Sequence, residues 1–270
     1  MGTSESPPLL FDMTIHYLKN YVRYLFCSRH WRGYGIHSPF VFELVTRVIE
    51  EKLPYYKYGL VEKVRKIYQT SSKSLFLDGE EVKVSRLAKR LSMDPSHAQV
   101  MFRLVNKFKP RNVVETGMGM GITTMYLAAP DAKLNVVTIE RRKVLAEFAS
   151  SYIRKAGFRN VKVEEGDPLE RLSKVMDGME ELDFLYMGDC LEGKDVEARL
   201  RICMPKMSCR SVLVVCGIYE NESMTEAWRH IQAMEKVRVT LDLFKYGIVI
   251  FDGRLQKEDY YLRYFPDFHI

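Results

Sequence analysis

The sequence contains no apolar run long enough to cross a bilayer. Its longest apolar runs, 211–216 and 248–251, fall far short of the ~20 residues that a membrane-spanning helix needs. The first ten residues are polar and proline-containing, and they lack the apolar core of a secretory signal. We therefore expect a cytoplasmic protein with no transmembrane segment.

Cysteine is scarce, and its spacing argues against cysteine-based scaffolds. The chain has five cysteines, none in a Cys-x-x-Cys pair and none beside a cluster of histidines. An odd number of cysteines does not fit a disulfide framework, and structural zinc sites typically use Cys-x-x-Cys pairs. We therefore predict reduced thiols and no zinc site for these five residues: Cys27, Cys190, Cys203, Cys209 and Cys216.

Acidic residues are few in the first part of the chain. Residues 1–110 contain 18 Lys and Arg against 10 Asp and Glu, whereas residues 111–270 contain 23 against 25. The net charge of +6 thus comes from the N-terminal segment, where any attraction to an anionic partner is expected. Its aromatic and basic stretch 17–32 could contact RNA or a membrane. We prefer an amphipathic helix that covers the rest of the protein.

From residue 110 onward, short apolar runs alternate with helical stretches. Such alternation is typical of right-handed crossovers in a mostly parallel sheet. Two final strand-like runs, 237–244 and 248–251, are separated by three residues, which requires an antiparallel hairpin. The earlier strands are expected at 112–115, 134–140, 161–165, 182–187 and 211–216, and the helices at 121–129, 141–156, 168–176, 195–204 and 223–234.

This pattern predicts an α/β fold with a Rossmann-like, seven-stranded, mostly parallel sheet that includes an antiparallel C-terminal hairpin strand. The first part of the chain shows helical spacing without strand alternation, for example at Phe11, Ile15, Leu18 and Val22. We therefore expect an N-terminal helical cap over residues 1–108, with residues 1–8 disordered, and a sheet domain over residues 109–270.

A glycine-rich loop joins the first expected strand of the sheet domain to the helix that follows. Gly117, Gly119 and Gly121 allow a sharp turn and a close ligand approach, and the next helix begins with free N–H groups. A dinucleotide fingerprint would need a third glycine where Ile122 stands. Glu115, two residues before the first glycine, would repel a pyrophosphate. The loop therefore favours a cationic nucleoside over a dinucleotide.

Two further acids follow the next two expected strands. Glu140 ends the second strand, where a carboxylate can accept hydrogen bonds from ribose hydroxyls. Asp167 follows the third strand and can accept from an adenine amino group. Each has a structural alternative, Glu140 as an acid at a helix start and Asp167 as the N-cap of the helix from Pro168. Three acids at successive strand ends beside the glycine loop favour a binding site.

These motifs resemble those of the class I S-adenosylmethionine (SAM)-dependent methyltransferases. More narrowly, residues 35–42, 224–228 and 239–244 resemble a bacterial group whose sheet domain is similar to that of catechol-type O-methyltransferases. The likeness covers residues 29–265. It implies that S-adenosyl-L-methionine binds, and S-adenosyl-L-homocysteine (SAH) leaves, through these residues: Glu115, Thr116, Gly117, Met118, Gly119, Gly121, Glu140 and Asp167.

The resemblance ends where catechol-type enzymes hold a metal. Those enzymes carry an Asp after the fourth strand and an Asp-Asn pair after the fifth, whereas residues 188–190 are Gly-Asp-Cys and residues 216–217 are Cys-Gly. Magnesium needs several oxygen ligands. We therefore predict a reaction without an obligatory metal.

Three residues are candidates for the chemistry. Asp189 follows the fourth strand and is the first choice for a general base, with a solvated loop acid as the alternative. Tyr219 stands at the position where the related group has a histidine. Its hydroxyl could form a hydrogen bond with the acceptor; the alternative is an aromatic residue of the loop without a catalytic role. His37, in the 35–42 motif, either closes over the pocket or, as we prefer, holds the cap by hydrogen bonds.

The sequence thus predicts a SAM-dependent methyltransferase that acts on the oxygen of a small-molecule acceptor. Two alternatives stay open. One is a SAM-binding protein that has lost turnover and serves regulation or scaffolding. The other is an RNA-directed methyltransferase, suggested by the basic N-terminal segment, although a nucleic acid partner is the less favoured interpretation. A homodimer also stays open, and the spacing does not identify the acceptor.

Overall fold

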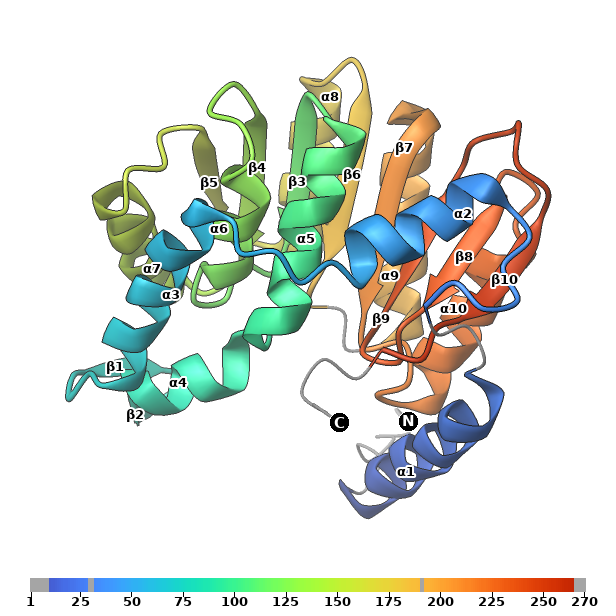
Figure 1. The fold of residues 1–270 in the computed structure, drawn as a ribbon. Coiled ribbons are helices and arrows are strands. Elements are labelled where there is room, and N and C mark those ends of the chain that lie inside the picture. Colours follow the sequence, from blue (N-terminus) through green and yellow to red (C-terminus); the bar gives the residue numbers. More distant parts are fainter. Residues whose placement is uncertain (1–9, 29–31, 190–191, 265–270) are drawn as a thin grey trace, which may run out of the picture.

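The computed structural model describes residues 10–28, 32–189 and 192–264 (Figure 1). These residues form a central sheet with helices on both faces, together with a separate β-hairpin. The expected disorder of residues 1–8 falls outside the described residues. No helix in these ranges is both long and apolar enough to cross a membrane.

The central sheet has eight strands within the described residues, in the order β10-β8-β9-β7-β6-β3-β4-β5. β9 (Tyr246–Ile250) lies between β7 and β8 (Val239–Asp242) and is antiparallel to both. The α/β fold class, with a mostly parallel Rossmann-like sheet and an antiparallel strand near the C-terminus, is confirmed. All the other strands of this sheet run in one direction, and besides β8 and the edge strand β10 they are β3 (Asn112–Thr116), β4 (Asn135–Glu140), β5 (Val161–Glu165), β6 (Leu182–Met187) and β7 (Met207–Cys216).

Two details of the sheet differ from the prediction. An eighth strand, β10 (Glu258–Tyr261), pairs in parallel with the edge of β8. Its four residues are too few and too polar to show a strand pattern. They are held by pairing with β8 and by burial of Tyr260 in the core. The hairpin turn also lies earlier than expected, at residues 243–245, with Leu243 N–H donating to the Tyr246 carbonyl at 3.0 Å. Tyr246 and Gly247 therefore belong to β9.

Helices cover both faces of the sheet (Figure 1). One face packs against α8, α9 and α10 through residues such as Leu172, Val196 and Trp228. The other packs against α6, α7 and N-terminal elements through residues such as Met125 and Leu145. The bounds are α6 (Ile122–Ala128), α7 (Lys143–Lys155), α8 (Pro168–Asp177), α9 (Gly193–Cys203), a short 3-10 turn (Met204–Lys206) and α10 (Glu222–Ala233).

The N-terminal segment adds a β-hairpin to the helices that were expected. β1 (Ser74–Leu77) and β2 (Glu80–Lys83) pair around Asp78 and Gly79, whose φ angles are 51° and 88°. An Asp-Gly pair is a strong signal for such a turn, but four-residue strands are too short to show clear alternation. The helical elements are α1 (Leu10–Cys27), α2 (Pro39–Leu44), a π-helical turn (Val45–Ile49), α3 (Tyr56–Gln69), α4 (Val84–Leu91) and α5 (Pro95–Phe108).

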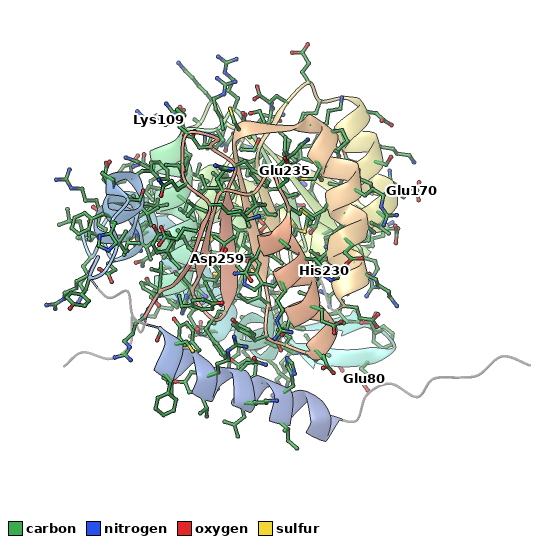
Figure 2. All side chains as sticks on the ribbon, turned by 90° about the vertical axis from the view of Figure 1, so that its right-hand side faces the viewer. Glu80, Lys109, Glu170, His230, Glu235 and Asp259 are labelled. Carbon is green, nitrogen blue, oxygen red and sulfur yellow. The ribbon has the colours of Figure 1, made fainter. Side chains whose placement is uncertain are left out.

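The parallel strands all finish at the same end of the molecule, which is the lower end in Figure 1. We call this end the carboxyl edge. α1 and the β1–β2 hairpin also lie there. The side view in Figure 2 agrees, with Glu80 of β2 at the end where α1 lies and Lys109, which precedes β3, at the opposite end.

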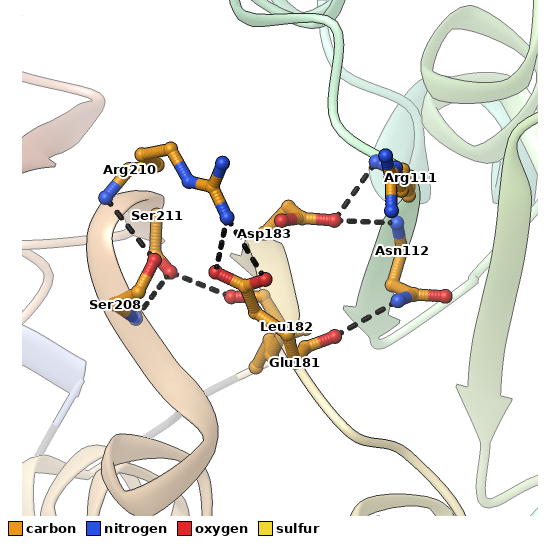
Figure 3. Close-up of polar contacts among 8 residues, drawn as sticks. All are labelled: Arg111, Asn112, Glu181, Leu182, Asp183, Ser208, Arg210 and Ser211. Atoms are coloured by element: carbon orange, nitrogen blue, oxygen red, sulfur yellow. Dashed lines mark hydrogen bonds and ion pairs between the residues drawn. The ribbon is translucent and has the colours of Figure 1, made fainter.

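Polar contacts at the opposite end fix β3, β6 and β7 relative to one another (Figure 3). The Asp183 carboxylate on β6 accepts hydrogen bonds from the backbone N–H groups of Arg111 and Asn112, at 2.8 and 2.9 Å. On β7, the Ser211 hydroxyl donates to the carbonyl of Leu182 at 2.6 Å. These contacts help to hold the register that brings the ends of the three strands together at the carboxyl edge.

Candidate functional site

The glycine loop turns sharply between β3 and α6 at the carboxyl edge. Gly117, Gly119 and Gly121 have φ angles of 83°, 54° and 74°, in the left-handed region that residues with a Cβ rarely adopt. The N–H groups of Gly117 and Met118 donate to the carbonyl oxygen of Ile139 at 2.9 and 3.3 Å. The loop is thereby joined to the end of β4, in the strand–loop–helix order that the sequence predicted.

Close packing also explains why two of these positions are occupied by glycine. A Cβ on Gly117 would lie 2.3 Å from the Cβ of Asp189, and a Cβ on Gly119 would lie 3.1 Å from the carbonyl oxygen of Leu91. Leu91 is the last residue of α4, so the N-terminal segment reaches the loop directly. The glycines are therefore needed for packing whether or not a ligand approaches.

Glu115 is fully buried on the face of the sheet that α6 covers. Its Oε2 accepts hydrogen bonds from the hydroxyls of Thr124 and Thr138, the latter at 2.6 Å. Its Oε1 has no hydrogen-bond partner among the described residues. Burial raises the pKa of this carboxyl from 4.5 to about 8, although the two hydroxyls oppose the shift. Glu115 is therefore mostly protonated at neutral pH unless a cation lies nearby.

Glu140 ends β4 and holds the glycine loop. Its Oε2 accepts from the N–H of Gly119 at 2.9 Å, and its Oε1 accepts from the backbone N–H and the Nε of Arg142 at 3.0 and 3.1 Å. The side chain is only 3% exposed. The carboxylate is thus positioned beside the loop, as expected, and it also has the structural role of an acid near the start of α7. Its contact with a ribose stays a prediction.

Asp167 has the capping role that the sequence offered as its alternative. Its Oδ1 accepts from the N–H groups of Leu169 and Glu170, at 3.0 and 3.1 Å, and caps α8. Because the residue is exposed, capping leaves it accessible to a ligand. The expected contact with an adenine amino group stays a prediction.

Asp189, the candidate base, forms an ion pair with Arg199, a residue that the sequence did not single out. Nη1 of Arg199 donates to Oδ1 of Asp189 and, at 2.7 Å, to the hydroxyl of Thr116, while Nη2 lies 3.3 Å from Oδ2. Arg199 is 5% exposed. The sequence did contain a signal for this contact. Arg199 lies between Val196 and Leu200 on the buried side of α9, and a charge within an apolar stripe needs a partner.

Tyr219 also has a buried partner that the sequence did not reveal. Its hydroxyl donates to Oδ2 of Asp242 at 2.5 Å, and the other oxygen of Asp242 accepts from the N–H of Phe244 at 2.8 Å. Burial raises the pKa of Asp242 from 3.8 to about 6. The Tyr219 ring stacks on Phe244 with centroids 5.4 Å apart. Asp242 was noted only within the 239–244 resemblance.

The three predicted catalytic residues lie in three separate places. Thr116, Gly117 and Asp189 are connected by the contacts of Arg199 and by close packing. Tyr219 forms a second group with Asp242. His37 is itself exposed and lies two residues before α2, and no hydrogen bond in the described part of the chain involves it. Across the same residues, no three His, Cys, Asp or Glu side chains gather as a metal site would need.

Comparison with known proteins gives a family match for the segment that contains the glycine loop. Residues 109–186 match the model of a family described as "Putative methyltransferase". No curated protein matches the chain significantly.

Solved methyltransferase structures share the fold. An O-methyltransferase from Bacillus cereus in complex with SAH has 18% identity and a TM-score of 0.54, over 78% of this chain and 97% of that one. TomG, an O-methyltransferase from Streptomyces achromogenes involved in tomaymycin synthesis and solved with SAM, has 15% identity and a TM-score of 0.55, over 77% and 95%. An SAH-bound methyltransferase from Podospora anserina has 13% identity and a TM-score of 0.52, over 74% and 98%. The chain therefore has the class I methyltransferase fold that its motifs predicted.

Proposed function

We propose that this chain, with its class I methyltransferase fold, is a SAM-dependent methyltransferase that binds its cofactor at the glycine loop. The observation that carries the proposal is the left-handed bend at Gly117–Gly121, set between Glu115 and Glu140. This bend lies within the segment 109–186 that matches a methyltransferase family. Three related structures contain SAM or SAH, which supports the same cofactor here.

The acids around the loop suit a positively charged nucleoside. Glu115 has one buried oxygen without a partner, and a cationic group beside it would favour the ionised form. Glu140 sits against Gly119 at the end of β4, where it would accept from ribose hydroxyls. Asp167 is accessible at the end of β5 and would accept from adenine.

The chemistry that SAM supplies is a methyl group on a sulfonium, which is already activated for displacement. The protein's part is to align an acceptor with it, and alignment alone accounts for much of the rate in such reactions. An oxygen acceptor on a small molecule, methylated without an obligatory metal, is the reaction we favour. A metal at Asp189 would have to displace the buried guanidinium of Arg199. That exchange is unfavourable because it leaves a buried charge unpaired.

A second candidate is a protein that binds SAM without turnover. This candidate is favoured because the side chains of both leading catalytic candidates already bond to other residues of the protein. The Asp189 carboxylate is held by Arg199, and the Tyr219 hydroxyl is held by Asp242. The pairing with Arg199 lowers the tendency of Asp189 to take a proton from an acceptor, and the Tyr219 hydroxyl proton is donated to Asp242 rather than to an acceptor.

Calorimetric titration with SAH tests the cofactor site. Glu140→Ala should weaken binding by roughly tenfold to a hundredfold, because a charged acceptor is lost. Glu140→Gln keeps an acceptor for Gly119 N–H and separates loss of ribose binding from loss of the loop's shape. Glu147→Gln, on the exposed side of α7, is the matched control. Absence of SAH and SAM binding, with no change in Glu140→Ala, would refute the proposal.

Transfer of a labelled methyl group from SAM to a panel of phenols, alcohols and carboxylic acids separates the two candidates. Turnover that persists in a chelator supports the metal-independent reaction. If Asp189 is the base, Asp189→Asn should lower kcat by about a hundredfold with little change in SAH affinity. Cofactor binding without transfer to any acceptor would favour the second candidate.

A further inference from the structure

Among the residues that the structure describes, the side chains of helix α1 contact the sheet domain from one face of the helix. On that side, His16 Nε2 lies 2.9 Å from the Thr225 hydroxyl, and Asn20 and Tyr24 are buried. The ring of Tyr24 lies against Phe244, with centroids 5.2 Å apart. Tyr17 and Tyr21 contact the same Phe244 ring, with centroids 5.0 and 5.1 Å away. At this spacing of three and four residues, all these contacts lie on one face of the helix.

The opposite side of α1 carries large apolar side chains that face solvent. Ile15, Leu18, Val22 and Phe26 are 50%, 59%, 45% and 80% exposed. Their spacing of three and four residues places them in one continuous stripe. Single exposed apolar residues are common on protein surfaces, but a continuous apolar stripe usually marks an interaction surface.

Helix α4 presents an exposed basic side. Its apolar residues Val84, Leu87 and Ala88 are buried. None of its exposed basic side chains forms an ion pair within the described residues. These side chains are Lys83, at the N-cap, with Arg86, Lys89 and Arg90. A short helix with this distribution is suited to an anionic surface.

The apolar and basic surfaces lie at the same end of the molecule. The last residue of α4, Leu91, packs against Gly119 of the glycine loop, which places α4 at the carboxyl edge. Figure 1 shows α1 and α4 on either side of this edge, and the side view in Figure 2 places both α1 and the hairpin that precedes α4 at this end. Acids of the hairpin offset part of the α4 charge, namely Asp78, Glu80 and Glu81.

We propose that the carboxyl edge docks on an anionic lipid surface. The stripe of Ile15, Leu18, Val22 and Phe26 enters the boundary between headgroups and acyl chains, and the basic side chains of α4 contact the headgroups. Burial of apolar area and attraction to anionic lipids are the two terms that hold interfacial helices on membranes.

The two surfaces together favour lipid over other partners. The aliphatic side chains of Ile15, Leu18 and Val22 would gain nothing from the phosphates of RNA, which basic and stacking aromatic residues recognise. Pairing of two copies through this edge would bring like charges on α4 together. A lipid surface satisfies both the apolar and the basic side chains. Docking in this way would direct the glycine-loop end of the sheet toward the lipid, and it does not depend on methyl transfer.

The test is co-sedimentation of the full chain with vesicles of phosphatidylcholine alone and with an equimolar mixture of phosphatidylcholine and phosphatidylserine. The chain should bind the mixed vesicles, and added salt should weaken binding. Leu18→Ser combined with Val22→Ser should lower the affinity by at least about tenfold. Arg86→Glu combined with Lys89→Glu should do the same. Thermal melting checks that each variant is folded.

The matched control reverses two charges at the opposite end of the molecule, by Lys109→Glu combined with Lys236→Glu, and should leave vesicle binding within about twofold of the unchanged chain. The proposal is overturned if the chain does not bind the mixed vesicles, or if the α1 and α4 variants bind them as tightly as the unchanged chain does. It is also overturned if the chain binds polyuridylate in an α4-dependent manner but not vesicles. A dimer that Leu18→Ser with Val22→Ser dissociates in sedimentation velocity, without vesicle binding, would assign the stripe to a second copy instead.

Discussion

The buried carboxyl of Glu115 should make the free energy of unfolding fall as the pH rises. In the folded protein its pKa is about 8, raised from 4.5 by burial, whereas in the unfolded chain it returns to its ordinary value. Between these two values the folded state binds a proton that the unfolded state releases, so a rise in pH favours unfolding. The slope is at most roughly 1.4 kcal/mol per pH unit. Between pH 5 and pH 8 the loss is about 4 kcal/mol as an upper limit.

Glu115→Gln replaces the titrating carboxyl with an amide that does not ionise. The amide oxygen still accepts from the hydroxyls of Thr124 and Thr138. Its free energy of unfolding, from urea denaturation followed by fluorescence, should be similar to that of the unchanged chain at pH 5. The variant should become the more stable of the two as the pH approaches 8. Other acids titrate alike in both proteins and cancel in the difference. Glu147→Gln should track the unchanged chain at every pH. A difference between Glu115→Gln and the unchanged chain that stays constant with pH would refute the reasoning.

Two further changes probe the packing at the carboxyl edge. Tyr219→Phe should lower the free energy of unfolding by about 1 to 3 kcal/mol above pH 6, because buried Asp242 loses a donor while ionised. The loss should shrink at pH 5, where Asp242, with its pKa raised to about 6, is mostly protonated; a pH-independent loss would contradict this. Gly247→Ala places a Cβ 2.2 Å from the Trp228 ring and should cost about 1 to 3 kcal/mol, seen as a lower Tm. Gly59→Ala, in open space on α3, should instead stabilise by up to about 1 kcal/mol, and equal effects of both substitutions would be inconsistent with the packing.

The amino-acid sequence was sufficient to predict features that depend on neighbouring residues. Alternating apolar runs predicted the five parallel strands and the antiparallel strand, because strand and helix periodicities are local properties of the chain. The spacing of Gly117, Gly119 and Gly121 predicted the bend before α6, since few other residues adopt those backbone angles. Asp167 beside Pro168 indicated a helix N-cap, and the structure has one.

Tertiary structure alone decided which side chains meet. Arg199 lies 83 residues from Thr116 in sequence and bonds to it because the packing of α9 carries it beneath the end of β3. Tyr219, in the turn after β7, meets Asp242, at the end of β8, because β7 and β8 are both neighbours of β9. Burial of Glu115 against Thr138 likewise follows from the pairing of β3 with β4. Such contacts depend on strand order and register, which local spacing does not specify, and these contacts set the charge and freedom of the candidate catalytic groups.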